Sequence, residues 1–84
     1  MLTVYTTTWC GDCRRLEAQL DQEGIAYLAV DIERDPAAER LVLALTGGVQ
    51  TIPTVVFDDG SALVEPTIVE VKDHLARPGG DQPA

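Results

Sequence analysis

The fold of this chain is decided by residues 6–16, which read TTTWCGDCRRL. The residues that lead into this stretch, Leu2–Thr6, are mostly β-branched or aromatic, which predicts a strand. Beyond it, Leu16 and Leu20 follow each other at i, i+4 and Gly24 stands where a helix commonly ends, so a helix is expected there. The only two cysteines therefore fall where a strand passes into a helix.

Two further elements are expected after this helix. Residues 25–31, IAYLAVD, form a nearly continuous apolar run, which predicts a strand covered on both faces and parallel to the first. Asp35 and Pro36 predict a helix start, because aspartate caps a helix N-terminus and proline suits its first position. Apolar residues at helical spacing follow at Ala38, Leu41, Val42 and Leu45. Gly47 and Gly48 end that helix.

The last third of the chain predicts a hairpin and a helix. Residues 54–57 and 61–64 read as short antiparallel strands separated by the turn sequence DDG at 58–60. Thr67 and Glu70 fit a capping box at the start of the last helix. The predicted inner stripe of that helix is Ile68, Val71 and Leu75.

Length limits the chain to one small domain. Eighty-four residues suffice for a single core and no more. The predicted order β-α-β-α-β-β-α describes an α/β fold around a central four-stranded mixed sheet. We assign residues 1–76 to this domain and residues 77–84, which hold no core-forming residue, to a flexible C-terminal tail.

Charge and hydropathy exclude several classes of partner. Fourteen acidic residues against six basic ones give a net charge of -8, which disfavours nucleic acid and anionic membrane surfaces. The longest apolar stretch is far short of the roughly 18 to 20 residues that cross a bilayer, and the first residues lack a signal-peptide pattern. We therefore expect a cytoplasmic monomer with no nucleic-acid or membrane partner.

The cysteine pair predicts redox chemistry. Cys10 and Cys13 are too close in sequence for their disulfide to be a useful structural staple, and in a reducing cytoplasm such a pair is more often catalytic or metal-binding. Cys10 would lie beside the free N–H groups of the helix start, which favour the thiolate, the attacking species in disulfide exchange. We therefore predict Cys10 as the nucleophile and Cys13, one turn later and turned inward, as the resolving thiol.

The neighbours of the cysteines admit two interpretations. Gly11 lets the backbone turn without a Cβ in the path of an incoming disulfide. Asp12 either raises the pKa of Cys10, because its carboxylate opposes the nearby thiolate, or is an ordinary acidic residue in a first helical turn.

Two cysteines and His74 are too few for the four ligands of a closed zinc site, so no metal is expected within one chain. A metal or cluster shared between two chains stays open.

Six segments together resemble a known family. They are 9–16 (WCGDCRRL), 24–27 (GIAY), 30–33 (VDIE), 47–48 (GG), 51–55 (TIPTV) and 59–61 (DGS). This pattern resembles the glutaredoxin-like proteins of the thioredoxin superfamily, and most nearly the mycoredoxins, which reduce mixed disulfides with mycothiol. The likeness runs from residue 2 to about residue 75 and implies the thioredoxin and glutaredoxin fold.

The resemblance implies a substrate-binding role for Thr51, Ile52 and Pro53. Pro53 corresponds to the cis-proline of the family, which faces the active-site cysteines. The backbone from Thr51 to Pro53 would pair with the thiol substrate like an added strand. An edge-strand proline in the trans form is the alternative.

The resemblance implies substrate contacts for five further residues. Trp9 would flank the nucleophile, and Gly60 and Ser61 match the position where glutaredoxins contact the far end of their bound thiol. Gly11 and Asp12 would contribute from the motif itself. The alternatives are a half-buried core aromatic for Trp9 and an ordinary turn for Gly60 and Ser61.

Two features depart from the family pattern. Asp12 replaces an aromatic residue common at that position, and the acidity of the chain differs from glutathione-using relatives, which offer basic residues to the carboxylates of the tripeptide. Mycothiol carries no net charge, so an acidic surface penalises it less than anionic thiols.

The expected activity is that of a thiol-disulfide oxidoreductase without a bound cofactor. Cys10 would reduce mixed-disulfide proteins with a low-molecular-weight thiol as co-substrate. One alternative is a glutaredoxin-like electron donor that is reduced by thioredoxin reductase. Another is a non-enzymatic module that uses Cys10 and a partner to hold an iron–sulfur cluster.

Overall fold

Four strands form one mixed sheet in the order β2-β1-β3-β4. The strands of the computed structural model, which describes residues 1–76, are β1 (Leu2–Thr6), β2 (Tyr27–Asp31), β3 (Thr54–Val56) and β4 (Ala62–Val64). β1 and β2 run parallel, whereas β3 is antiparallel to both β1 and β4. The predicted mixed sheet is confirmed, and the predicted tail at 77–84 lies outside the described residues.

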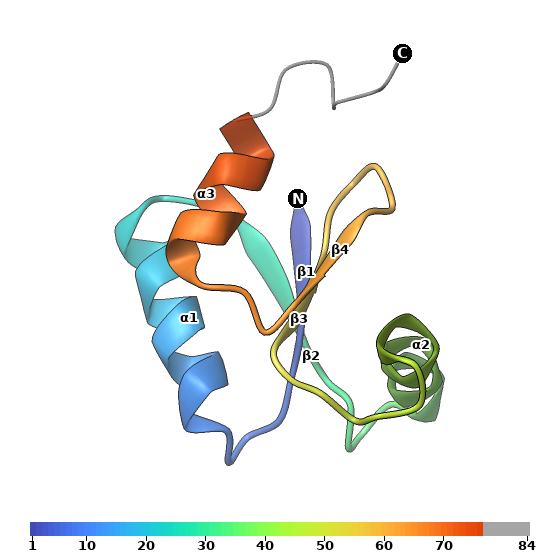
Figure 1. The fold of residues 1–84 in the computed structure, drawn as a ribbon. Helices are drawn as coiled ribbons and strands as arrows, with labels where there is room; N and C mark the ends of the chain where they lie inside the picture. Colours follow the sequence, from blue (N-terminus) through green and yellow to red (C-terminus); the bar gives the residue numbers. More distant parts are fainter. Residues whose placement is uncertain (77–84) are drawn as a thin grey trace.

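Three helices lie on the two faces of this sheet. They are α1 (Gly11–Gln22), α2 (Pro36–Thr46) and α3 (Ile68–Ala76). Figure 1 shows α1 and α3 on one side of the sheet and α2 on the other. The element order β-α-β-α-β-β-α is thus the predicted one. None of the helices in this part of the chain has the length and apolarity to cross a bilayer.

The larger apolar core lies between the sheet and the helices α1 and α3. Side chains of β1 alternate in burial, so every second residue faces this core. Its buried members are Leu2, Val4, Leu16, Leu20, Val55, Phe57 and Val71. Because α1 contributes Leu16 and Leu20 to this core, it packs against the sheet that contains β1.

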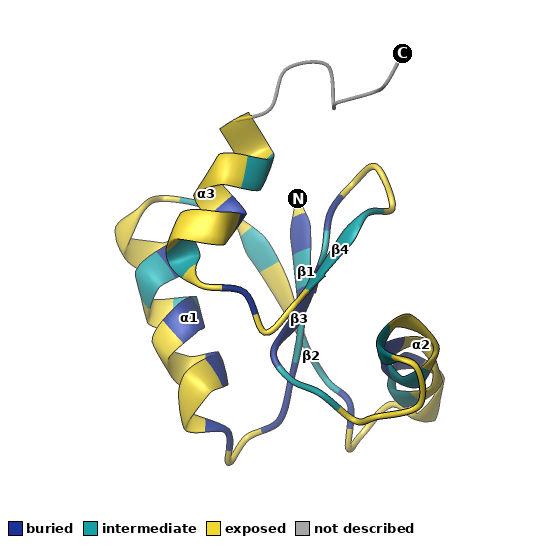
Figure 2. Ribbon diagram, in the orientation of Figure 1, coloured by how far each residue is buried: buried dark blue, intermediate teal, exposed yellow. Residues whose placement is uncertain are grey.

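The opposite face of the sheet is covered less completely. Its core consists of Ile32, Ala38 and Val42, with Tyr5 and Ile52 packed against it. Because one helix alone covers this face, residues at the margins of the packing stay in contact with solvent (Figure 2).

Two packing predictions are wrong, and two apolar residues of α2 also lie exposed. Residues 25–31 were expected to form a strand covered on both faces, but β2 is an edge strand with Leu28 half-exposed. Leu41 and Leu45 keep the helical period of α2 yet lie exposed beside the buried Val42. Leu75 in the last turn of α3 is likewise exposed, because α3 extends past the sheet that Val71 contacts.

The predicted helix ends are confirmed. The Asp35 side chain accepts the Ala38 N–H at 3.2 Å, and Gly47 ends α2 in the left-handed region at φ 78°. At α3 the capping box is complete, because the Thr67 N–H donates to Glu70 Oε1 at 2.8 Å and the Glu70 N–H donates to Thr67 Oγ1 at 3.1 Å.

Candidate active site

Cys10 is the N-cap residue of α1. Its backbone is extended, and its Sγ accepts the backbone N–H of Cys13 at 3.1 Å. An N-cap side chain that accepts such a bond lies at the positive end of the helix dipole. The predicted position of Cys10 at the junction of strand and helix is therefore confirmed, and both cysteines are free thiols.

Cys13 lies one turn later on the inner face of α1. It is fully buried, as the helical period predicts, whereas Cys10 retains 8% exposure. Burial, assisted by a hydrogen bond with Cys10, raises the pKa of the Cys13 thiol to about 12. At neutral pH Cys13 therefore stays protonated, and the two cysteines are chemically distinct.

This difference predicts ordered alkylation of the folded protein. Near pH 7, iodoacetamide should label Cys10 first, because Cys13 is both buried and protonated. Since the pKa of Cys13 is raised, its labelling rate should increase about tenfold per pH unit toward pH 12. Peptide mapping by mass spectrometry after timed labelling measures both rates, and protein unfolded in urea is the control. Equal labelling of the two cysteines in the folded protein at neutral pH would contradict the assigned environments.

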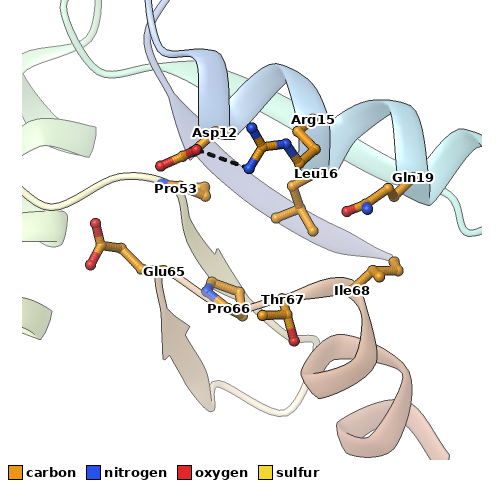
Figure 3. A pocket seen from close by; sticks show the side chains of 9 residues that line it. All are labelled: Asp12, Arg15, Leu16, Gln19, Pro53, Glu65, Pro66, Thr67 and Ile68. Carbon is orange, nitrogen blue, oxygen red and sulfur yellow. Dashed lines mark hydrogen bonds and ion pairs between the residues drawn. The ribbon is translucent and has the colours of Figure 1, made fainter.

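A pocket opens beside the start of α1. It encloses about 390 Å³ between α1 and the segment that joins β4 to α3 (Figure 3). The residues that line it are Asp12, Arg15, Leu16, Gln19, Pro53, Glu65, Pro66, Thr67 and Ile68. Of the residues proposed from the sequence, Asp12 and Pro53 thus meet in one pocket next to the cysteine motif.

The segment before β3 supplies one side of this pocket. The Ile52–Pro53 peptide bond is cis, and the Pro53 carbonyl accepts the Glu65 N–H at 2.8 Å. Thr51 and Ile52 are half-buried, and Ile52 packs against the core under α2. The bond from Glu65 to Pro53 holds the β4–α3 connection against the segment before β3.

The charged groups of the pocket are largely satisfied within the chain. Arg15 Nη1 lies 3.3 Å from Asp12 Oδ1, so this cation is paired with an acid of the same pocket (Figure 3). Glu65 adds a second carboxylate, and the N-terminus of α3 is capped by the carboxylate of Glu70. The pocket therefore has no excess of positive charge.

Gly60 and Ser61 lie away from this pocket, in the turn of the hairpin. The Ser61 hydroxyl donates to Asp59 Oδ1 at 2.5 Å and lies 2.8 Å from His74 Nε2, while the His74 ring stacks on Phe57. Figure 1 shows this turn near the N-terminus and far from the start of α1. The structure thus joins Ser61 to His74 of α3 and does not bring Gly60 or Ser61 to the cysteines.

Trp9 lies on the surface next to Cys10. Its side chain is 67% exposed, so it is not a core aromatic. Its indole N–H donates to Glu33 Oε2 at 2.9 Å. Gly11, on the other side of Cys10, is exposed, and a Cβ placed on it would meet no heavy atom within 4 Å. The residue before Cys10 is therefore an exposed aromatic side chain, and the residue after it has open space around it.

Several pocket residues were not found from the sequence. Glu65 and Pro66 carried no recognised motif, and Thr67 was seen only as a helix cap. In the structure Glu65 has a positive φ of 50°, which marks a sharp change of chain direction that the residue types did not indicate. The residue pattern around Glu65 also gives no indication that the segment between β4 and α3 lies beside α1.

Comparisons with known proteins agree with this geometry. The glutaredoxin family model matches residues 2–63, so the chain belongs to the glutaredoxin family. A candidate glutaredoxin of Mycobacterium tuberculosis is 49% identical over 79 residues, which is 94% of each chain. Mycoredoxin 1 of Corynebacterium glutamicum is 36% identical over 70 residues, which is 83% of this chain and 86% of that protein.

The fold agrees with solved structures of the same class. The crystal structure of a thioredoxin-like protein matches with a TM-score of 0.71 at 29% identity, and the match covers 87% of this chain and 97% of that one. The protein is thus a mycoredoxin-like glutaredoxin, a redox protein with a thioredoxin fold and two neighbouring cysteines. In residues 1–76, no three side chains of His, Cys, Asp or Glu come together as a possible metal site.

Proposed function

We propose that this protein reduces protein mixed disulfides through Cys10, with an uncharged low-molecular-weight thiol of the mycothiol type as co-substrate. The observation that carries the proposal is the Sγ of Cys10 at the cap of α1, which accepts the Cys13 N–H at 3.1 Å, two residues before Asp12 in the pocket lining. In this proposal Trp9, Gly11 and Asp12 flank Cys10 along the chain. Pro53, which lines the pocket together with Asp12, contacts the substrate with Thr51 and Ile52 before it.

The chemistry consists of two exchanges. The Cys10 thiolate attacks the sulfur of the small thiol in the mixed disulfide, so the target protein leaves as a thiolate and the small thiol is bonded to Cys10. A second small thiol then attacks this bond, releasing Cys10 and forming the small-molecule disulfide. Alternatively Cys13 gives up its proton and attacks Cys10, which expels the small thiol and leaves a Cys10–Cys13 disulfide for an external dithiol to reduce.

The charges around the pocket support an uncharged thiol. Glutathione carries two carboxylates, yet Arg15 is already paired with Asp12, and Glu65 would repel an anion. The Thr67 N–H lies at the N-terminus of α3, where an anion is favoured, but it already donates to the Glu70 carboxylate. A ligand that offers hydroxyl and amide groups avoids these costs.

The proposal is tested by comparing which reducing system supplies electrons to the protein. NADPH consumption is followed with a mycothiolated model protein and three reducing systems: mycothiol with its reductase, glutathione with its reductase, and thioredoxin reductase alone. We expect turnover with mycothiol, with the Cys10→Ser protein as the blank.

The other outcomes of this assay decide against the proposal. Turnover with thioredoxin reductase alone would identify an electron donor of the redoxin type, for which the neighbouring Cys13 supplies the dithiol. Turnover with glutathione at the same rate as with mycothiol would contradict the charge argument. No turnover with any system would contradict the activity itself.

A further inference from the structure

We infer that Glu33 is a positioning residue, which holds the Trp9 side chain beside Cys10 as the surface that receives the protein half of a mixed disulfide. The inference rests on the proposed function, because it concerns the substrate of the same cysteine. It assigns the pocket to the small-thiol half of that substrate and the Trp9 side chain to the protein half.

The first observation is the bond between two loops that are distant in sequence. Trp9 Nε1 donates to Glu33 Oε2 at 2.9 Å, across 24 positions of the chain. A tryptophan side chain that is 67% exposed would otherwise be free to change rotamer, and ordering it during binding would weaken the complex. A carboxylate acceptor reduces this cost, because bonds to a charged group are stronger than neutral ones.

The second observation is that Glu33 is itself held in place. Its backbone N–H donates at 2.9 Å to Oδ1 of Asp31, which is the last residue of β2. The preceding residue, Ile32, is buried, and its N–H donates to the Thr6 carbonyl at 3.0 Å. The backbone that carries the Glu33 side chain is therefore anchored at the end of the sheet, close to the last residue of β1.

The third observation is the position of the pocket relative to Trp9. The pocket that suits a small thiol is lined by residues of α1, Pro53 and the β4–α3 segment, and Trp9 is not among them. The exposed indole therefore lies outside this pocket and stays available to another part of the substrate. An ordered aromatic face with an apolar body and a satisfied N–H is suited to a polypeptide surface.

The test compares Glu33→Ala with Glu33→Gln, which keeps an acceptor oxygen but loses the charge. With the reductant that supports the wild-type protein, we expect Glu33→Ala to raise KM for a protein mixed disulfide by about threefold to tenfold with little change in kcat, the effect of one surface hydrogen bond. KM for the mixed disulfide of the small thiol with 2-mercaptoethanol should not change. Glu33→Gln should recover most of the loss.

Two controls separate positioning from a general effect of charge. Asp73→Asn removes one exposed carboxylate on α3 and should leave both KM values unchanged. In a Trp9→Phe background, which lacks the indole N–H, Glu33→Ala should have no further effect, because the two residues act as one unit. Equal losses in both backgrounds would overturn the inference.

A second measurement does not depend on activity. Trp9 is the only tryptophan, so its fluorescence reports on this side chain alone. We expect acrylamide to quench it about twice as efficiently in Glu33→Ala as in wild type, with Glu33→Gln close to wild type, because a lost hydrogen bond of this size releases the ring for much of the time. Unchanged quenching in Glu33→Ala would show that Glu33 does not restrain the ring. Failure of the wild type in every reducing system would instead contradict the proposed function.

Discussion

The Cys10→Ser protein is expected to lose turnover of mixed disulfides by at least about 1,000-fold, as removal of a catalytic nucleophile does. A serine hydroxyl at the cap of α1 can still accept the Cys13 N–H, so the helix start is preserved while the sulfur nucleophile is removed. Steady-state assays with a thiolated model protein measure the loss, and thermal unfolding confirms that the variant is folded.

The Cys13→Ser protein is the matched comparison. Because the single-cysteine route uses Cys10 and a second small thiol, this variant should keep de-thiolation within a few-fold of wild type. It should accumulate no internal disulfide after oxidation, which mass spectrometry detects. If Cys13→Ser were as inactive as Cys10→Ser, the dithiol route would be obligatory.

Leu20→Ala is expected to lower the free energy of unfolding more than any other substitution proposed for this protein. Leu20 is fully buried on α1 in the core formed with β1, β3 and α3, so its truncation removes apolar contacts and leaves a cavity. The free energy of unfolding should fall by about 2 to 5 kcal/mol, out of roughly 5 to 15 for a domain. The melting temperature should drop by about 10 °C or more, since each kcal/mol shifts it by roughly 4 to 8 °C at this size.

Leu45→Ala is the control for this substitution. Leu45 lies on α2 and is 39% exposed, so the same truncation should cost less than Leu20→Ala by at least about 1 kcal/mol. Urea unfolding of both variants gives the comparison. Similar losses for the two variants would contradict the packing described for α2.

The prediction from sequence was accurate where short-range chemistry decides the structure. The caps at Asp35 and Thr67 and the turn at 58–60 each depend on groups within a few residues. The buried position of Cys13 follows from the helical period that it shares with Leu16. The order of elements and the mixed sheet follow from these local features and the rules of chain connection.

Helical periodicity was a weaker guide to burial. Leu45 and Val42 share the apolar spacing of α2, but only Val42 is buried, because one helix packs on that face of the sheet. A period states which side of a helix is apolar. How much of that side is covered depends on what else packs there, which is a property of the whole molecule.

The sequence by itself determined that Cys10 caps a helix and that Cys13 lies behind it, because a strand, a turn and a helical period specify those positions within one segment. Only the tertiary structure decided which residues surround the sulfur. The β4–α3 connection lies next to α1, where Glu65 bonds to Pro53, and the β2–α2 loop brings Glu33 to Trp9. These contacts join segments that are far apart in the chain, and their pairing depends on the sheet order and on helix packing, which no local pattern encodes.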